Sequence, residues 1–363
     1  MNNCVLKVQG LRVDRGGIQI LDIPSFSLYG QEFVTLIGPN GCGKSTLLLS
    51  IMCLLRRVTG SINYKGEEID SDQKALAYRR KIAMVLQDPL LFDATIYDNV
   101  ASGLKFRGIK GPQANKTVSE YLERFNLAHM AKRYARKLSG GEARRVSLAR
   151  AFAVEPDMIF FDEPFANLDP PTRQTLSEDM VRIIRETGIS AVLVTHDQSE
   201  ALRLSDRIVV MNKGMIVQTG TSTAVMNNPV NEFVANFVGM ETILEGVVKQ
   251  NLDGQMIISV ADAEEIYVIG EVPQGEEVYC GVRPENVVID TVNPAETTSA
   301  RNVFPAKITE ISSLGPFLRV SLDCGFPLVS YLTREAFATL KLEVGKDVFA
   351  SFKATAVHLI QKK

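Results

Sequence analysis

Cysteine is scarce in this chain of 363 residues, and the five cysteines are scattered along it. None of them forms a CxxC pair, which argues against a zinc site or a disulfide framework and fits a reducing compartment. An excess of positive charge is also missing, because 40 lysines and arginines are offset by 42 aspartates and glutamates. The formal net charge of −2 gives no sign of a basic face, so we expect no nucleic-acid partner. The cysteines are Cys4, Cys42, Cys53, Cys280 and Cys324.

Long apolar runs are absent as well. The longest one, over residues 47–55, is broken by Ser50 and is too short to cross a hydrocarbon layer of roughly 30 Å. The first residues lead into an alternating strand pattern and not into a secretion signal, so we expect a cytoplasmic chain. The length leaves room for two domains, each of roughly 100–200 residues.

A glycine-rich loop follows the apolar run of residues 33–37 and reads GPNGCGKST. Glycines let the backbone curl until successive N–H groups point at a phosphate. Lys44 is placed to reach the β- and γ-phosphates, and Ser45 offers a hydroxyl to Mg²⁺. Because a helix is predicted directly afterwards, its N-terminus also favours an anion. We therefore expect this loop to bind a nucleoside triphosphate. Its residues are Gly38, Pro39, Asn40, Gly41, Cys42, Gly43, Lys44, Ser45 and Thr46.

Polar residues follow two further apolar runs. Asp162 and Glu163 come after residues 158–161, and His196 comes after residues 190–195. Parallel α/β sheets bind their ligands at the carboxyl ends of the strands, so we expect these side chains to gather beside the phosphate loop. The predicted roles are Mg²⁺ ligand for Asp162, general base on the attacking water for Glu163, and γ-phosphate donor for His196.

The order of elements predicts an α/β fold. Residues 5–28 alternate around a Gly-Gly turn and predict an antiparallel pair of strands, whereas residues 96–153 have mostly helical spacing. Buried strands that alternate with helices predict a largely parallel sheet covered on both faces. Gln87 ends a strand predicted over residues 82–86 and offers an amide oxygen to Mg²⁺ or water.

The pattern changes after about residue 239. Short strands separated by turn signals, with one helix over residues 333–340, predict a small β-barrel or sandwich. The polar stretch of residues 290–299 indicates a join between two β sub-units. The predicted domains are residues 1–239 and 240–363, and the predicted sub-units are residues 240–292 and 299–361.

Residues 139–142 read Ser-Gly-Gly-Glu and precede a helix expected to begin near Ala143. In order and spacing, this segment and the motifs above resemble the nucleotide-binding subunits of ATP-binding cassette (ABC) transporters over about residues 5–239. The resemblance implies a P-loop NTPase cassette that binds ATP and Mg²⁺ and hydrolyses ATP to ADP and phosphate. It makes residues 38–46 the Walker A loop and Gln87 the Q-loop. The signature is then Ser139, Gly140, Gly141 and Glu142; Walker B ends in Asp162 and Glu163; the D-loop is Ala166, Asn167, Leu168 and Asp169; and His196 is the switch histidine.

The resemblance also implies partners. In that family two subunits pair head to tail, and the signature of one caps the ATP on the other. A homodimer on the cytoplasmic face of the membrane, a transmembrane permease and, indirectly, a periplasmic or extracellular binding protein are therefore expected. Two departures stand out. The family usually stacks an aromatic residue on adenine where this chain has Arg15, so Arg15 is the candidate ATP-binding residue there and would stack through its guanidinium. Glu142 replaces a commoner glutamine.

The C-terminal part carries a second resemblance. Residues 281–287, GVRPENV, are similar to the TOBE domains of importer ATPases, which are small OB-like barrels. Residues 299–302, SARN, and residues 353–357, KATAV, look like the paired motifs of the molybdate-binding Mop fold. This implies an importer ATPase for molybdate or tungstate whose C-terminal domain senses the oxyanion. The candidate oxyanion residues are Ser299, Ala300, Arg301, Asn302, Lys353 and Thr355.

Other interpretations stay open at this point. TOBE domains also accompany importers of sulfate, ferric iron and sugars, in which the C-terminal domain would be purely structural. A soluble ABC ATPase acting on ribosomes or DNA usually has two cassettes or a coiled-coil insertion, and this sequence shows one cassette and no heptad run. An oxyanion storage protein with a vestigial ATPase conflicts with the intact set of catalytic motifs.

Overall fold

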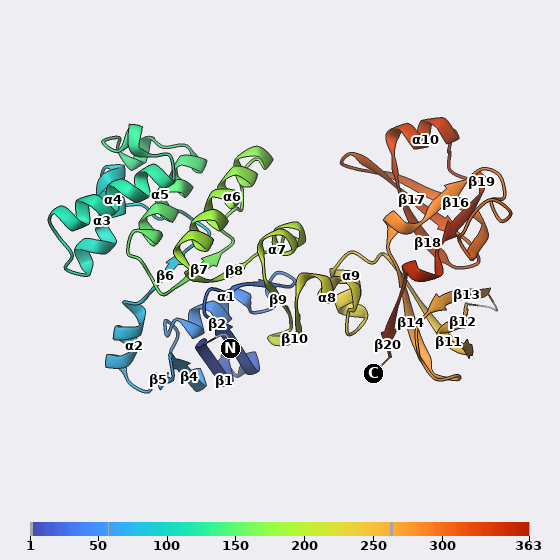
Figure 1. The fold of residues 1–363 in the computed structure, drawn as a ribbon, viewed down its shortest axis with the longest axis horizontal. Helices are drawn as coiled ribbons and strands as arrows, with labels where there is room; N and C mark the ends of the chain where they lie inside the picture. The colour runs from blue at the N-terminus through green and yellow to red at the C-terminus, as the bar shows by residue number, and fades with distance from the viewer. Residues whose placement is uncertain (1–2, 57, 262–263, 363) are drawn as a thin grey trace. The chain divides into compact units, whose positions relative to one another are not determined.

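The computed structural model describes residues 3–56, 58–261 and 264–362. The chain forms two compact units, Met1–Ser222 and Thr223–Lys363 (Figure 1). The first unit is an α/β structure and the second is almost wholly β. The predicted domain boundary after residue 239 lies further along the chain, so helix α9 (Glu232–Phe237) falls in the second unit.

A six-stranded sheet organises the first unit, in the order β10-β9-β3-β8-β7-β6. The pairings from β9 to β6 are all parallel, and β10 is antiparallel to β9. The sequence prediction of a largely parallel sheet is therefore confirmed. The strands are β3 (Phe33–Ile37), β6 (Ile82–Val85), β7 (Met158–Asp162), β8 (Ser190–Val194), β9 (Arg207–Asn212) and β10 (Met215–Gly220).

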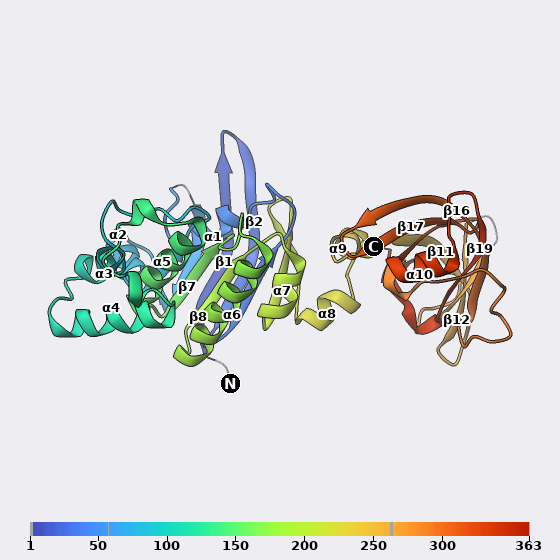
Figure 2. The ribbon, with the colours of Figure 1, turned by 90° about the horizontal axis from the view of Figure 1, so that it is seen from above.

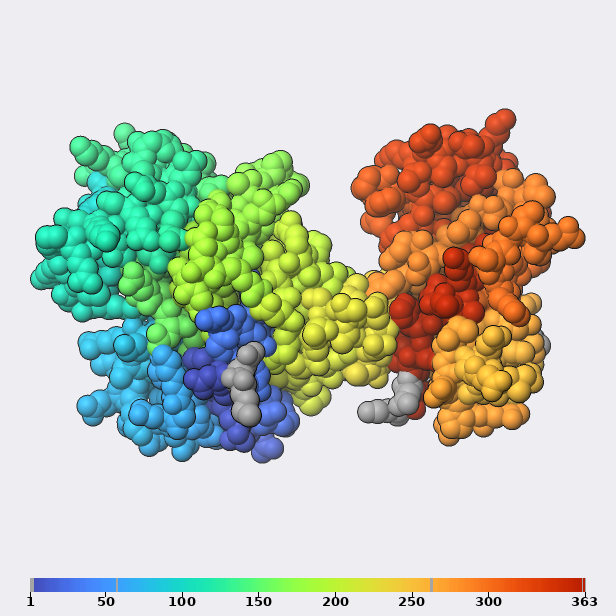
Figure 3. Space-filling view, viewed as in Figure 1, coloured from blue at the N-terminus to red at the C-terminus, as the bar shows by residue number. Residues whose placement is uncertain are grey.

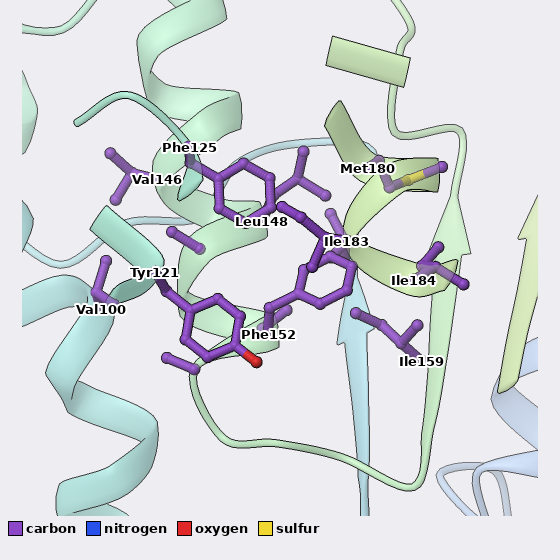
Figure 4. Close-up of a cluster of buried hydrophobic side chains, with 14 of the residues drawn as sticks. Val100, Tyr121, Phe125, Val146, Leu148, Phe152, Ile159, Met180, Ile183 and Ile184 are labelled. Carbon is purple, nitrogen blue, oxygen red and sulfur yellow. The ribbon is translucent and has the colours of Figure 1, made fainter. Parts of the chain in front are cut away.

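Alternate residues of the central strands enter two different cores. On β7, Ile159 and Phe161 join a core with the helices, whereas Met158 and Phe160 join the core on the opposite face. Figure 4 shows the first core, in which Phe152 packs beside Ile159. Because side chains on a strand alternate between faces, a strand covered on both sides reads as a continuous apolar run.

A four-stranded antiparallel sheet, in the order β2-β1-β4-β5, packs on one face of the six-stranded sheet. Its long hairpin of β1 and β2 extends beyond the rest of the unit in Figure 2 and turns at Gly16 and Gly17, both with positive φ. The predicted antiparallel pair is confirmed. The elements here are β1 (Cys4–Arg15), β2 (Ile18–Tyr29), β4 (Val58–Tyr64), β5 (Glu67–Glu68), α1 (Lys44–Ile51) and α2 (Asp72–Arg79).

Helices cover the other face and form the cyan-to-green lobe in Figure 3. Helix α5 begins at Gly140, three residues before the predicted start near Ala143, because Ser139 and Glu142 form a capping box around its first turn. The helices and 3₁₀ turns of this unit are α3 (Ile96–Phe106), α4 (Pro112–Arg124), η1 (Ala128–Met130), η2 (Ala135–Lys137), α5 (Gly140–Phe152), α6 (Pro170–Thr187) and α7 (Gln198–Leu204).

The second unit contains two five-stranded antiparallel sheets, in the orders β13-β12-β11-β14-β20 and β15-β19-β16-β17-β18. The predicted OB-like β domain is confirmed as a pair of half-barrel sheets around one core. Strands are exchanged between the sheets: β20 comes from the chain end but pairs with β14, and β15 comes from the earlier half but pairs with β19. The sheets therefore do not divide at the predicted linker of residues 290–299.

The elements of the second unit follow the short spacing expected from the turn signals. The helix predicted over residues 333–340 is present, with Thr333 as its N-cap. The elements are α8 (Ser222–Asn227), α9, β11 (Thr242–Leu252), β12 (Gln255–Val260), β13 (Glu264–Ile269), β14 (Glu277–Val282), η3 (Pro284–Asn286), β15 (Val288–Asp290), β16 (Asn302–Leu314), β17 (Phe317–Asp323), β18 (Pro327–Thr333), α10 (Arg334–Leu340), β19 (Asp347–Phe352), η4 (Ala354–Ala356) and β20 (Val357–Gln361).

Within the described part of the chain, every helix is too short or too polar to cross a membrane.

Candidate functional site

The phosphate loop joins β3 to α1 and depends on glycine for its shape. Gly38 has a φ of 154°, and a Cβ placed there would lie 2.2 Å from the carbonyl oxygen of Met211. Gly43 has a φ of 104°, and a Cβ there would lie 2.6 Å from the side chain of Leu21. Neither position can hold a side chain, so the backbone itself must line the phosphate cradle.

Lys44 and Ser45 are oriented by short contacts within the site. The Lys44 ammonium is buried and donates to the carbonyls of Gly38 at 2.8 Å and Pro39 at 2.9 Å. The Ser45 hydroxyl donates to Asp162 Oδ1 at 2.9 Å, which joins the loop after β3 to the end of β7. A hydroxyl and a carboxylate at this distance are the hard oxygen ligands that Mg²⁺ takes beside a bound triphosphate.

Asp162 is a partly buried carboxylate. Burial raises its pKa above the usual range, and the nearby charge of Glu163 raises it further. The Ser45 hydroxyl and the Lys44 ammonium act in the opposite direction. The residues around Asp162 therefore compensate its charge only in part, which is the electrostatic condition that a divalent cation relieves.

Glu163 and His196 face each other across the ends of β7 and β8. Glu163 Oε2 lies 3.2 Å from His196 Nδ1, and the Glu163 backbone N–H donates to the Val194 carbonyl at 2.9 Å. Glu163 has a φ of 45°, a left-handed conformation that costs a non-glycine residue roughly 1–2 kcal/mol. Its side chain is mostly buried, whereas that of His196 is 59% exposed. The strand order thus brings the predicted catalytic pair together beside Ser45 and Asp162.

The signature segment, residues 139–142, begins α5. Ser139 Oγ accepts from the Glu142 N–H at 3.3 Å, and Glu142 Oε2 accepts from the Ser139 N–H at 2.7 Å. That backbone donor lowers the pKa of Glu142, and Arg133 lies 3.2 Å from its other oxygen. Glu142 therefore preserves the cap that a glutamine would make and adds a charge.

The structure does not bring the signature segment to the phosphate loop. Among residues 3–56, 58–261 and 264–362, no hydrogen bond or ion pair joins the two. Asp169 of the D-loop caps α6 by accepting from the Thr172 N–H at 3.1 Å, and a Cβ on Gly141 would lie 3.1 Å from the Thr172 methyl. The signature and the D-loop are therefore neighbours.

Gln87 is exposed at the end of β6, and its backbone is held by a residue that the sequence argument left unassigned. The buried guanidinium of Arg144, on α5, donates to the Leu86 carbonyl at 2.7 Å and also to the Gln87 carbonyl. Arg150, on the same helix, donates to the Leu90 carbonyl at 2.7 Å. The sequence feature that could have indicated these contacts is the run of arginines directly after the signature segment.

A second unassigned residue, Arg173 on α6, joins the D-loop to the segment that carries His196. Its guanidinium lies 3.1 Å from Asp197 and 3.5 Å from the Leu168 carbonyl. Beneath it, the buried Glu200 accepts from the Thr195 hydroxyl at 2.7 Å, and burial raises the Glu200 pKa. No sequence motif indicated this link, because its members are far apart in the chain.

The candidate oxyanion motifs meet in the second unit. Ser299, Arg301, Lys353 and Thr355 line one cavity of about 220 Å³, and Ala300 lines an adjoining one. Asn302 has a different position: its buried carboxamide accepts from the Tyr267 N–H at 2.7 Å and donates to the Tyr267 carbonyl at 2.9 Å. Its polar atoms therefore hold β13 against β16.

Comparisons with known proteins find relatives of both units. The ABC transporter family matches residues 21–166, and the TOBE domain family matches residues 298–359. The molybdate/tungstate import ATP-binding protein WtpC of Pyrococcus abyssi is 36% identical over 357 residues, which cover 98% of this chain and 100% of that protein. The sulfate/thiosulfate import ATP-binding protein CysA of Thermosynechococcus vestitus is 36% identical over 334 residues, or 91% of this chain and 89% of that protein.

A solved structure is similar as well. CbiO1 from Clostridium perfringens, part of the ABC transporter complex cbiONQ, has a TM-score of 0.58 at 28% identity, over 66% of this chain and 96% of that chain. The chain belongs to the ATP-binding subunits of ABC transporters, the ATPases that power transport, and it carries a C-terminal TOBE domain.

Proposed function

We propose that this chain is the ATP-hydrolysing subunit of a molybdate or tungstate importer and that its C-terminal unit senses the oxyanion. The observation that carries the proposal is the pair of cations in the SARN–KATA cavity. Arg301 and Lys353 both line it, and neither forms an ion pair with any residue that the structure describes. Ser299 and Thr355 add hydroxyl donors beside them. Unpaired cations and hydroxyls suit a compact dianion.

In the proposed ATPase cycle, Lys44 leaves the carbonyls of Gly38 and Pro39 and donates to the phosphates. Ser45 and Asp162 would hold Mg²⁺, which would supply positive charge to the phosphate oxygens. Glu163 orients the attacking water and accepts its proton, since its carboxylate is fixed at the strand end by its backbone and by His196. These assignments follow the predicted roles.

The proposal includes a second copy of the chain. Since Ser139 and the phosphate loop are separate within one chain, two subunits arranged head to tail would each complete the other's site. The backbone N–H groups at the start of α5 would then face the γ-phosphate of the partner. Glu142, already neutralised in part by Arg133, would tolerate that position.

The permease would dock beside Gln87. Large apolar side chains are exposed in this part of the first unit: Leu90 is 64%, Phe92 is 49% and Phe106 is 76% exposed. Exposed apolar groups near one another mark interaction surfaces in soluble proteins. The permease would place the chain at the cytoplasmic face of the membrane, and an external binding protein would deliver the cargo.

The cargo assignment competes with sulfate, ferric iron and sugar, and with the polyamines named for other relatives. One such relative, the spermidine/putrescine import protein PotA of Borreliella afzelii, is 35% identical over 290 residues. A cavity with Arg301 and Lys353 repels a cationic ligand, so the geometry favours an oxyanion. At high internal concentration the bound oxyanion would hold the two subunits apart and stop transport.

Calorimetric titration of the full chain with molybdate, tungstate and sulfate tests the sensor. We expect molybdate or tungstate to bind, and Lys353→Ala to weaken that binding at least tenfold. Lys307→Ala is the matched control, because Lys307 is an exposed lysine on β16 that lines neither cavity. If none of the three anions binds the wild-type chain, the sensor is excluded and the C-terminal unit is structural.

A further inference from the structure

A cavity of about 500 Å³ opens where the β1–β2 hairpin passes α1, and we call it the hairpin cavity. Thr46, the last residue of the phosphate loop, lines it, so the cavity adjoins the loop. Its volume lies within the range of about 300–1,000 Å³ that is usual for small-molecule sites. The cavity is therefore placed and sized for the remainder of a nucleotide.

The lining of the hairpin cavity combines apolar side chains with two arginines and one carboxylate, that of Asp14. Ile20 of β2 and Leu49 of α1 supply the apolar surface. Arg15 comes from the end of β1, and Arg56 comes from the segment after α1. The lining contains no aromatic residue, although such a ring is the usual stacking surface for a base.

Both arginines are available to a ligand. Each is exposed, and neither guanidinium forms a hydrogen bond or an ion pair with any residue that the structure describes. Arg12, on the same strand, differs in this respect because it lies 3.3 Å from Asp22. A guanidinium is planar, stacks on aromatic faces and is weakly hydrated, so two unpaired guanidiniums replace the missing ring at a low desolvation cost.

We propose that Arg56 joins Arg15, the residue expected at the adenine from the sequence, and that both guanidinium planes stack against the base of the bound nucleoside triphosphate. Arg56 is then a binding residue of the nucleotide site that no motif indicates. The inference rests on the ATP-binding role of the phosphate loop and is independent of the oxyanion cargo. The base lies on Ile20 and Leu49, with cationic planes in place of an aromatic ring.

The test compares the affinities of the full chain for ATP and for inorganic tripolyphosphate, which has the phosphates but no base. We expect Arg56→Ala to weaken ATP binding by about 3- to 30-fold, the range of a cation–π contact, and to change tripolyphosphate binding less than twofold. Arg56→Lys should lose nearly as much ATP affinity, because it keeps the charge but not the plane. Arg12→Ala, the matched control, should bind both probes like the wild type.

A variant that restores the ring gives a second measurement. Arg15→Tyr should keep or increase the affinity for ATP, since an aromatic face replaces the guanidinium plane. Equal losses for ATP and tripolyphosphate in Arg56→Ala would overturn the inference and make Arg56 a phosphate contact. Unchanged ATP affinity in Arg56→Ala would also overturn it. If the wild type bound neither probe, the proposed nucleotide site would be wrong as a whole. That outcome can be distinguished from the two results that overturn the role of Arg56 alone.

Discussion

At the scale of single residues, the charged form of Asp162 is disfavoured by its burial. Its pKa is raised mainly by burial, so the folded state favours the protonated carboxyl more than the unfolded state does. Such a group contributes most to stability at low pH, and the contribution is lost as the pH rises through the folded pKa. The site therefore holds a stability cost at neutral pH that Mg²⁺ would remove.

We expect Asp162→Asn to raise the thermal midpoint of the ligand-free chain at neutral pH, because the amide oxygen still accepts from Ser45 without carrying charge. The gain should shrink as the pH falls and the wild-type carboxyl becomes protonated. Asp169→Asn is a control of opposite sign, since the Thr172 N–H lowers the pKa of Asp169. It should lower the midpoint at neutral pH. A gain for Asp162→Asn that is independent of pH would contradict the assignment.

At the scale of elements, α5 connects the signature segment to Gln87. The helix starts at a capping box on Ser139, and one turn later Arg144 holds the carbonyls that follow β6. The link depends on side chains of α5 that bind backbone groups, namely Ser139 and Glu142 in the capping box and Arg144 at the carbonyls after β6. In the proposed transporter, this arrangement would connect the permease surface near Gln87 to the signature segment that faces the partner's nucleotide.

Arg144→Ala should destabilise the first unit by about 2–4 kcal/mol, because hydrogen bonds to a charged group are each worth about 1.5–3 kcal/mol and the carbonyls lose their donor. Urea unfolding followed by circular dichroism measures the change. Arg136→Ala is the matched control, since Arg136 and Asp93 form an exposed pair at 3.8 Å that is worth little. Equal midpoints for the two variants would show that the Arg144 contacts carry no stability.

At the scale of the whole molecule, no hydrogen bond or ion pair joins Ser139 to the phosphate loop within the described residues, and the proposed function has a second copy complete the site. Glu163→Gln should keep the site's shape but remove the proton acceptor, with a loss of about 10²- to 10⁴-fold in turnover. The ATP-bound form should then accumulate as a dimer, seen as a doubled mass by light scattering. Glu123→Gln, an exposed residue of α4, is the control and should hydrolyse ATP normally.

A second substitution makes the dimer prediction sharper. Ser139→Ala in the Glu163→Gln background should abolish the ATP-dependent dimer, because the γ-phosphate loses a donor from the facing subunit. Normal turnover by Glu163→Gln would remove Glu163 from the role of general base. A dimer that forms without ATP would place the subunit contact elsewhere.

Much of the fold follows from the sequence because local chemistry decides it. The Gly-rich loop, the apolar runs before Asp162 and His196, and the proline-started helix α6 each satisfy local rules of backbone conformation and burial. The predicted start of α5 lies three residues too late, although Ser139 and Glu142 carry the S-x-x-E pattern of a capping box. The strand exchange by β15 and β20 was missed because pairing between distant strands leaves no local pattern.

The sequence by itself determined the residues of the phosphate loop, the acidic and histidine ends of the strands, and the β character of the second unit. Only the tertiary structure decided which of these meet. It brings Glu163 into contact with His196 and joins Ser45 to Asp162 by a hydrogen bond. It also bonds the Asn302 amide to Tyr267, and it places Arg56 and Arg15 in the lining of one cavity. The reason is that backbone conformation and burial leave local traces in a sequence, whereas contacts between distant residues depend on sheet order and packing.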